Sequence, residues 1–105
     1  MDEPLMLDSR RIKSGLYKAS DRSFAVIDGY LEIKPPGFGL QGWSASVTID
    51  GSAGALVNTS DEGELEVEDD RGERWQGRCF AKISASSARL SELDLDGHGP
   101  IQRIR

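Results

Sequence analysis

The chain has 105 residues, which is enough for one domain with a single hydrophobic core and too few for two. Hydrophobic residues make up 37% and charged residues 30%, a balance typical of globular rather than disordered proteins. The formal net charge of -5 argues against the phosphates of nucleic acids and against anionic membrane surfaces as partners. The sequence contains no apolar run near the ~18 residues that span a membrane, and its only cysteine is Cys79. These features predict a cytoplasmic protein without an internal disulfide.

Residues 1–10 lack the apolar core of a signal peptide, and we expect them to form a flexible N-terminal arm. The next segment, residues 11–19, predicts a strand around Ile12, Leu16 and Tyr17. The chain is therefore expected to begin its regular structure near residue 11.

An Asp-Gly pair at residues 28–29 lies between two apolar segments and predicts a first β-hairpin, because a tight type I′ turn requires positive φ at both central residues. A two-residue loop pairs Val26 with Leu31 and Phe24 with Ile33. These four side chains then share one face, as a half-buried hairpin requires.

The Pro-Pro-Gly sequence at residues 35–37 marks a break after this hairpin. The glycine-rich segment that follows, up to residue 42, predicts a loop. It carries Phe38 and Leu40, which either close over the core or contact a partner.

Clean alternation from Trp43 to Ile49 predicts a strand with its apolar side chains on one face. A second Asp-Gly pair, at residues 50–51, predicts another two-residue hairpin. This loop length brings Leu56 opposite Ala45.

The sequence Asp-Asp-Arg-Gly at residues 69–72 predicts a third hairpin. A four-residue loop would mix apolar and polar side chains on each face. A three-residue loop with Gly72 in the left-handed conformation pairs Asp69 with Glu73 and keeps the apolar and polar faces separate. The inward face of this register carries Leu65, Val67, Trp75 and Cys79, and its outward face pairs Glu68 with Arg74 and Glu64 with Arg78.

The pattern after Ser84 predicts a turn or bulge near residues 86–91 and then a strand that ends at residues 96–97. Residues 98–105 indicate a C-terminal tail, since Pro100 cannot donate a hydrogen bond in a central strand. Several short strands at regular spacing predict a single all-β domain over residues 1–105. We expect a small antiparallel β-sandwich or barrel built from hairpins, with at most one short helical turn.

His98 is the only histidine and therefore the first candidate for a general base or a metal ligand. Metal binding requires further ligands at a recognisable spacing, such as His-Glu-x-x-His, which the sequence lacks. His98 stands between Gly97 and Gly99, which favours a solvent-exposed loop histidine.

Cys79 falls on the inward face of the third hairpin, which predicts a buried, unreactive thiol rather than a nucleophile. The serines lack a Gly-x-Ser-x-Gly motif, and the glycine-rich segment at residues 37–42 lacks the Lys-Ser/Thr ending of a phosphate-binding loop. We therefore predict no catalytic, cofactor-binding or metal-binding residue.

Residues 61–70 contain seven carboxylates, whose oxygens could surround a calcium ion. Within this segment Glu64, Glu66 and Glu68 alternate with apolar residues, as the solvent face of a strand does. The alternation favours a solvated face and leaves calcium binding as the open alternative.

Basic residues gather towards both ends of the sequence, while the third hairpin is acidic. A molecule with separate positive and negative regions can associate head to tail into rings or filaments. The pattern indicates self-association or binding to a protein partner, without direct nucleic-acid binding. The residues expected to contact a partner are Phe38, Leu40, His98, Ile101, Arg103 and Arg105.

Two segments near the C-terminus, Gly72–Phe80 and Leu93–Ile101, flank a serine-rich turn, and the second alternates before it closes on Gly-His-Gly-Pro. This arrangement resembles the C-terminal part of some phage tail-tube proteins. The resemblance covers about a third of the chain and rests mostly on turn residues. It implies a β-sandwich that assembles into hexameric rings with an acidic lumen suited to DNA passage, and it implies no catalysis.

We therefore expect a non-enzymatic β-module for protein assembly or protein binding, in its most concrete version a prophage or virion structural protein. One alternative is a small β-barrel that binds a small-molecule ligand in a pocket lined by Trp43, Trp75, Tyr30 and Phe38. A second alternative is a small enzyme that uses the carboxylates of the acidic hairpin.

Overall fold

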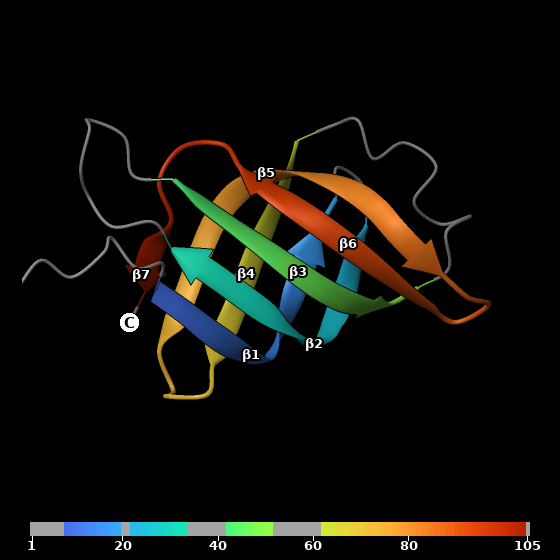
Figure 1. Cartoon of the computed structure of the whole chain (residues 1–105), viewed down its shortest axis with the longest axis horizontal. Coiled ribbons are helices and arrows are strands. Elements are labelled where there is room, and N and C mark those ends of the chain that lie inside the picture. The colour runs from blue at the N-terminus through green and yellow to red at the C-terminus, as the bar shows by residue number, and fades with distance from the viewer. Residues whose placement is uncertain (1–7, 20–21, 34–41, 52–61, 105) are drawn as a thin grey trace, which may run out of the picture.

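The computed structural model describes residues 8–19, 22–33, 42–51 and 62–104, and this part of the chain folds into a closed antiparallel β-barrel with one extra strand (Figure 1). The all-β class is confirmed, and the barrel is the form it takes. No helix among the described residues is long and apolar enough to cross a membrane. The strands are β1 (Asp8–Lys18), β2 (Ser23–Ile33), β3 (Trp43–Asp50), β4 (Gly63–Asp69), β5 (Arg74–Ser86), β6 (Leu90–Gly97) and β7 (Gln102–Ile104).

Neighbouring strands follow the order β4-β1-β2-β3-β6-β5, and the pairing of β4 with β5 closes the ring. The 13-residue β5 belongs to two parts of the wall, because residues 74–79 pair with β4 and residues 79–86 pair with β6. The short β7 lies on the β6 side of β5, where it pairs with residues 74–76. The barrel is thus built from two hairpin-rich halves joined by the β3–β6 and β1–β4 pairings.

Alternating apolar residues of all six barrel strands meet inside and fill the core. Trp43 spans the space beneath β5 and β6, and a Cβ atom added at Gly97 would overlap with its indole ring. Glycine at this position therefore makes room for the ring. The buried core residues are Ile12, Tyr17, Phe24, Val26, Leu31, Ile33, Trp43, Ala45, Val47, Ile49, Leu65, Val67, Cys79, Leu93, Leu95 and Ile101.

The hairpin predicted at residues 28–29 is wrong, because both residues lie inside the continuous strand β2. The four apolar side chains of that prediction are nevertheless buried on one face. A bulge at Ile27 shifts the register against β3, so that Ile27 and Asp28 both point outward and the alternation restarts at Gly29. One extra residue in a strand reverses its faces just as a tight turn would.

The alternating strand from Trp43 to Ile49 is confirmed as β3, with its four apolar side chains buried. The hairpin predicted at residues 50–51 is wrong, because β2 and β6 occupy both edges of β3 and Ala45 lies between Leu31 and Leu95. Its predicted partner Leu56 lies outside the described residues.

The third hairpin is confirmed in register, with Val67 opposite Trp75 and Leu65 opposite Gly77. The amide of Asp69 donates to the carbonyl of Glu73 over 2.8 Å, and Gly72 has a φ of 82°. The three-residue loop and its left-handed glycine are therefore as predicted. The strand expected to end at residues 96–97 is confirmed as β6.

Both chain ends contribute more structure than predicted. β1 begins at Asp8, so the prediction of a flexible N-terminal segment over residues 1–10 is wrong for its last three residues. Residues 1–7 lie outside the described part. The predicted tail over residues 98–105 contains β7, and Ile101 packs into the core at 6% exposure. As an edge strand, β7 is compatible with Pro100 two residues earlier.

Candidate functional site

The turn between β4 and β5 carries the most buried charge in the described structure. Asp69 has a fully buried carboxylate that accepts hydrogen bonds from Arg10 Nη1 at 2.9 Å and from the indole Nε1 of Trp75 at 3.0 Å. The backbone amides of Arg71 and Glu73 also donate to it, each over 2.9 Å. Burial alone would raise the pKa of Asp69, but these four donors outweigh it and lower the pKa to about 2.

Arg10 completes this cluster from β1. Its guanidinium lies 4.9 Å from the centre of the Trp75 ring and also contacts Glu73 at 2.6 Å. Arg103 on β7 reaches the same Glu73 carboxylate at 3.6 Å. The cluster therefore fastens β1, the β4–β5 turn and β7 to one another, and its groups satisfy each other in a structural role.

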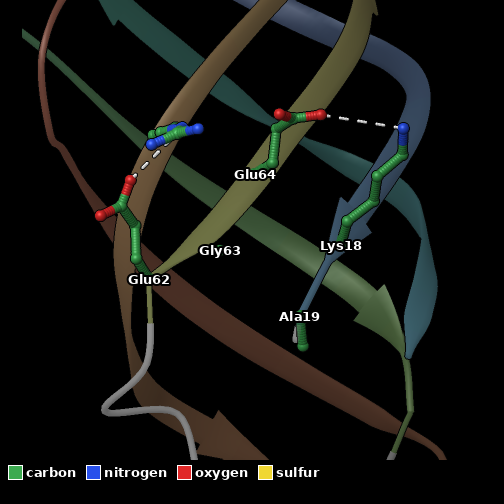
Figure 2. Close-up of a pocket in the computed structure, with 6 residues that line it drawn as sticks. Lys18, Ala19, Glu62, Gly63 and Glu64 are labelled. Carbon is green, nitrogen blue, oxygen red and sulfur yellow. Dashed lines mark ion pairs between the residues drawn. The ribbon is translucent and has the colours of Figure 1, made fainter. Parts of the chain in front are cut away.

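Two outward carboxylates of β4, those of Glu64 and Glu66, form ion pairs with basic residues. Lys18 lies 3.8 Å from Glu64 and 3.1 Å from Glu66, and Arg74 contacts Glu66 at 3.1 Å. Lys18, Glu64 and Arg78 are among the residues that line an open depression of about 420 Å³. Figure 2 shows Lys18 extending from β1 towards Glu64. The described residues contain no group of three or more His, Cys, Asp or Glu side chains placed to hold a metal ion. Glu68 stands opposite Arg74 in the β4–β5 pairing, as predicted, but Arg74 forms its ion pair with the diagonal neighbour Glu66.

His98 has defined neighbours although its side chain is exposed. Its Nδ1 lies 2.9 Å from Glu62 Oε2, its ring stacks on Phe80 at 5.2 Å, and its amide donates to the carbonyl of Arg78. Glu62 also contacts Arg78 Nε at 3.6 Å. The sequence offered no signal for the pair of His98 with Glu62, because 36 positions separate them.

The thiol of Cys79 is completely buried, as predicted from the hairpin register. Burial raises the pKa of Cys79 to about 12, and the carboxylates of Glu62 and Glu64 add to the effect. A nucleophilic thiolate is therefore disfavoured at neutral pH.

Three of the aromatic residues considered for a ligand pocket are described, and these three lie apart. Trp43 is in the core, Trp75 lies against Arg10 at the β4–β5 turn, and Tyr30 is 53% exposed on the outer surface of β2. Phe38 lies outside the described residues, as do Leu40 and Arg105 among the predicted partner contacts. Ile101 was predicted to contact a partner, but its side chain is used in the core.

Within the described part of the chain, the tip of the β5–β6 hairpin is a run of exposed residues. We call Ser84–Leu90 the arm, and each of its seven residues is exposed. A tight turn holds it, in which the amide of Ser87 donates to the carbonyl of Leu90 over 2.8 Å. Figure 1 shows the hairpin reaching past the ends of β2 and β3 along the long axis of the molecule.

An open, mostly apolar depression of about 630 Å³ lies where the arm meets β2 and β3. Ile27 and Leu90 line it and are 49% and 39% exposed. Neither residue was predicted as a contact from the sequence. Ile27 follows the alternation of β2 like any outward residue, and the small residues of the arm suit a buried turn equally well.

Comparisons with protein-family models, with curated proteins and with solved structures gave no match for this chain.

Proposed function

We propose that this protein is a non-catalytic assembly module whose arm contacts another protein, in the simplest case a second copy of the chain. The observation that carries this proposal is the exposed arm with its apolar depression. The seven residues of the hairpin tip are exposed, so they bury little surface against their own barrel. The exposed Ile27 and Leu90 lie together beside the tip, which is typical of a contact surface.

Two further observations support assembly over ligand binding or catalysis. The barrel interior is filled by side chains of all six strands, and Trp43, Trp75 and Tyr30 do not converge on a pocket. The buried charge of Asp69 is consumed in fastening three elements together. A prophage or virion structural protein remains the most concrete version of the proposal, on the resemblance of the C-terminal third to tail-tube proteins.

The test is the mass of the full chain in solution, measured by light scattering over a range of protein and salt concentrations. Leu90→Ser should weaken self-association at least several-fold, because it removes an apolar contact at the arm. Leu16→Ser is the matched control, since Leu16 is 41% exposed on β1 and does not line the depression at the arm. A strict monomer at all concentrations would overturn self-assembly, and equal effects of the two variants would overturn the role of the arm.

A further inference from the structure

The strand β7 is the least embedded strand of the described structure. It has three residue pairs, all with one strand, namely residues 74–76 of β5. One buried side chain, Ile101, and one ion pair, Arg103 with Glu73, supplement those pairs. The other six strands each have paired neighbours on both sides.

The place that β7 occupies is formed by the rest of the barrel. The edge of β5 is held by its pairing with β4 on the other side, and Trp75 in its middle is fixed by the hydrogen bond to Asp69. Any strand with the sequence of β7 would meet the same acceptor edge and the same space for Ile101.

The connection to β7 is short and contains a natural pivot. Residues 98–101 join Gly97 at the end of β6 to Gln102, and Gly99 has a φ of 89°. His98 is anchored by its contacts with Glu62 and Phe80. Rotation beyond Gly99 would therefore redirect β7 without disturbing the closed barrel.

From these features we infer that β7 exchanges between copies, so that the C-terminal strand of one chain pairs with β5 of its neighbour. This inference rests on the proposed function, and it adds the β7–β5 pairing as a second contact between copies beside that of the arm. Every contact of β7 is retained in the exchanged form, because the acceptor edge is identical. The exchanged form gains whatever surface the two barrels bury where they meet.

The length of the connection between β6 and β7 determines where the two barrels meet in the exchanged form. The three Cα–Cα steps from the pivot at Gly99 to Gln102 span at most about 10 Å, while the two shorter dimensions of the molecule are 26 and 25 Å. Two barrels can exchange β7 only if they abut at the hinge. The Phe80 side chain, 42% exposed and stacked on His98, then lies at the contact.

Disulfide trapping tests this exchange with full-length chains. Gln76 and Gln102 stand opposite each other in the β5–β7 pair, so one chain carries Gln76→Cys and a second carries Gln102→Cys. The mixture should yield a disulfide-linked pair on a non-reducing gel. Ser46→Cys on the outer face of β3 replaces Gln76→Cys in the control mixture, which should yield none.

The double variant Gln76→Cys/Gln102→Cys, oxidised in dilute solution, should close the bond within one chain and lose the exchange-dependent part of self-association. If Gln76→Cys does not fold, because Gln76 donates to Glu64 over 2.8 Å, the opposed pair Arg74→Cys and Ile104→Cys serves instead.

The outcomes separate this inference from the proposed function. Self-association of the wild type together with cross-linking in the mixture supports both. Self-association without cross-linking, in a protein whose double variant closes internally, overturns strand exchange and leaves assembly through the arm standing. A monomeric wild type that does not cross-link overturns both.

Discussion

The guanidinium of Arg10 lies 2.9 Å from the fully buried carboxylate of Asp69, although 59 positions separate the two residues in the chain. Arg10 itself is only 11% exposed. The pair connects the first strand of the barrel to the turn that joins β4 and β5, so its loss should loosen the junction between the two halves.

We expect Asp69→Asn to lower the free energy of unfolding by about 2–3 kcal/mol, because it removes the buried charge that the donors of Arg10 and Trp75 face, while Glu73 stays as the other carboxylate of Arg10. Its amide group would also face the N–H groups of Arg10 and Trp75. Urea denaturation followed by tryptophan fluorescence measures the change. Asp70→Asn, at the next and exposed position, is the control and should stay within about 0.5 kcal/mol of the wild type.

The lowered pKa of Asp69 predicts a specific acid sensitivity. Its pKa is about 2 in the folded protein against an ordinary value of 3.8, so the ionised carboxylate stabilises the folded state above pH 4. That stability, at most about 2 kcal/mol, should be lost as the pH falls from 4 to 2. Urea midpoints measured between pH 5 and pH 2 should therefore fall more steeply for the wild type than for Asp69→Asn. Parallel curves would contradict the assignment.

Ile101→Ala should destabilise the protein by about 2–4 kcal/mol, since it leaves a cavity where a buried side chain had packed. Ile104→Ala, three residues later at a half-buried position of β7, should cost about 1 kcal/mol. Thermal unfolding of both variants distinguishes an integral C-terminal segment from a dispensable tail. Equal and negligible shifts would favour the tail.

Cys79 should resist modification in the folded protein, because its thiol is fully buried and its pKa is raised to about 12. A chromogenic disulfide reagent at pH 8 should react with less than one thiol per chain until urea unfolds the barrel. Full labelling under native conditions at the rate of free cysteine would show that the β4–β5 wall opens readily.

The accuracy of the sequence predictions depends on how many constraints each pattern supplies. The β4–β5 register was predictable because its two faces carry independent patterns, apolar inside and opposite charges outside, and only a three-residue loop satisfies both. In β2, a tight turn and a one-residue bulge give the same set of inward residues, so the pattern alone cannot distinguish them.

The candidate site was less predictable than the fold, because it depends on contacts between distant parts of the chain. Leu90 is out of phase with Leu93 and Leu95, as an outward residue of the strand is, but the sequence does not show that it lines a depression together with Ile27 of β2. Arg10 with Asp69 and His98 with Glu62 come together only after β1 has paired with β4 and the β6–β7 connection has folded back. Local patterns in a sequence carry no information about such pairs.

The pairing of β1 with β4 has a consequence for how the chain folds. During synthesis the sheet β1–β2–β3 emerges first, and it carries one unpaired edge on β1 and another on β3. The first edge is covered when β4 appears, and the second only when β6 is complete at Gly97. Because closure depends on these non-local pairings, folding should be slow for a protein of this size. The nascent chain is most exposed to aggregation before β6 has been synthesised and has paired with β3.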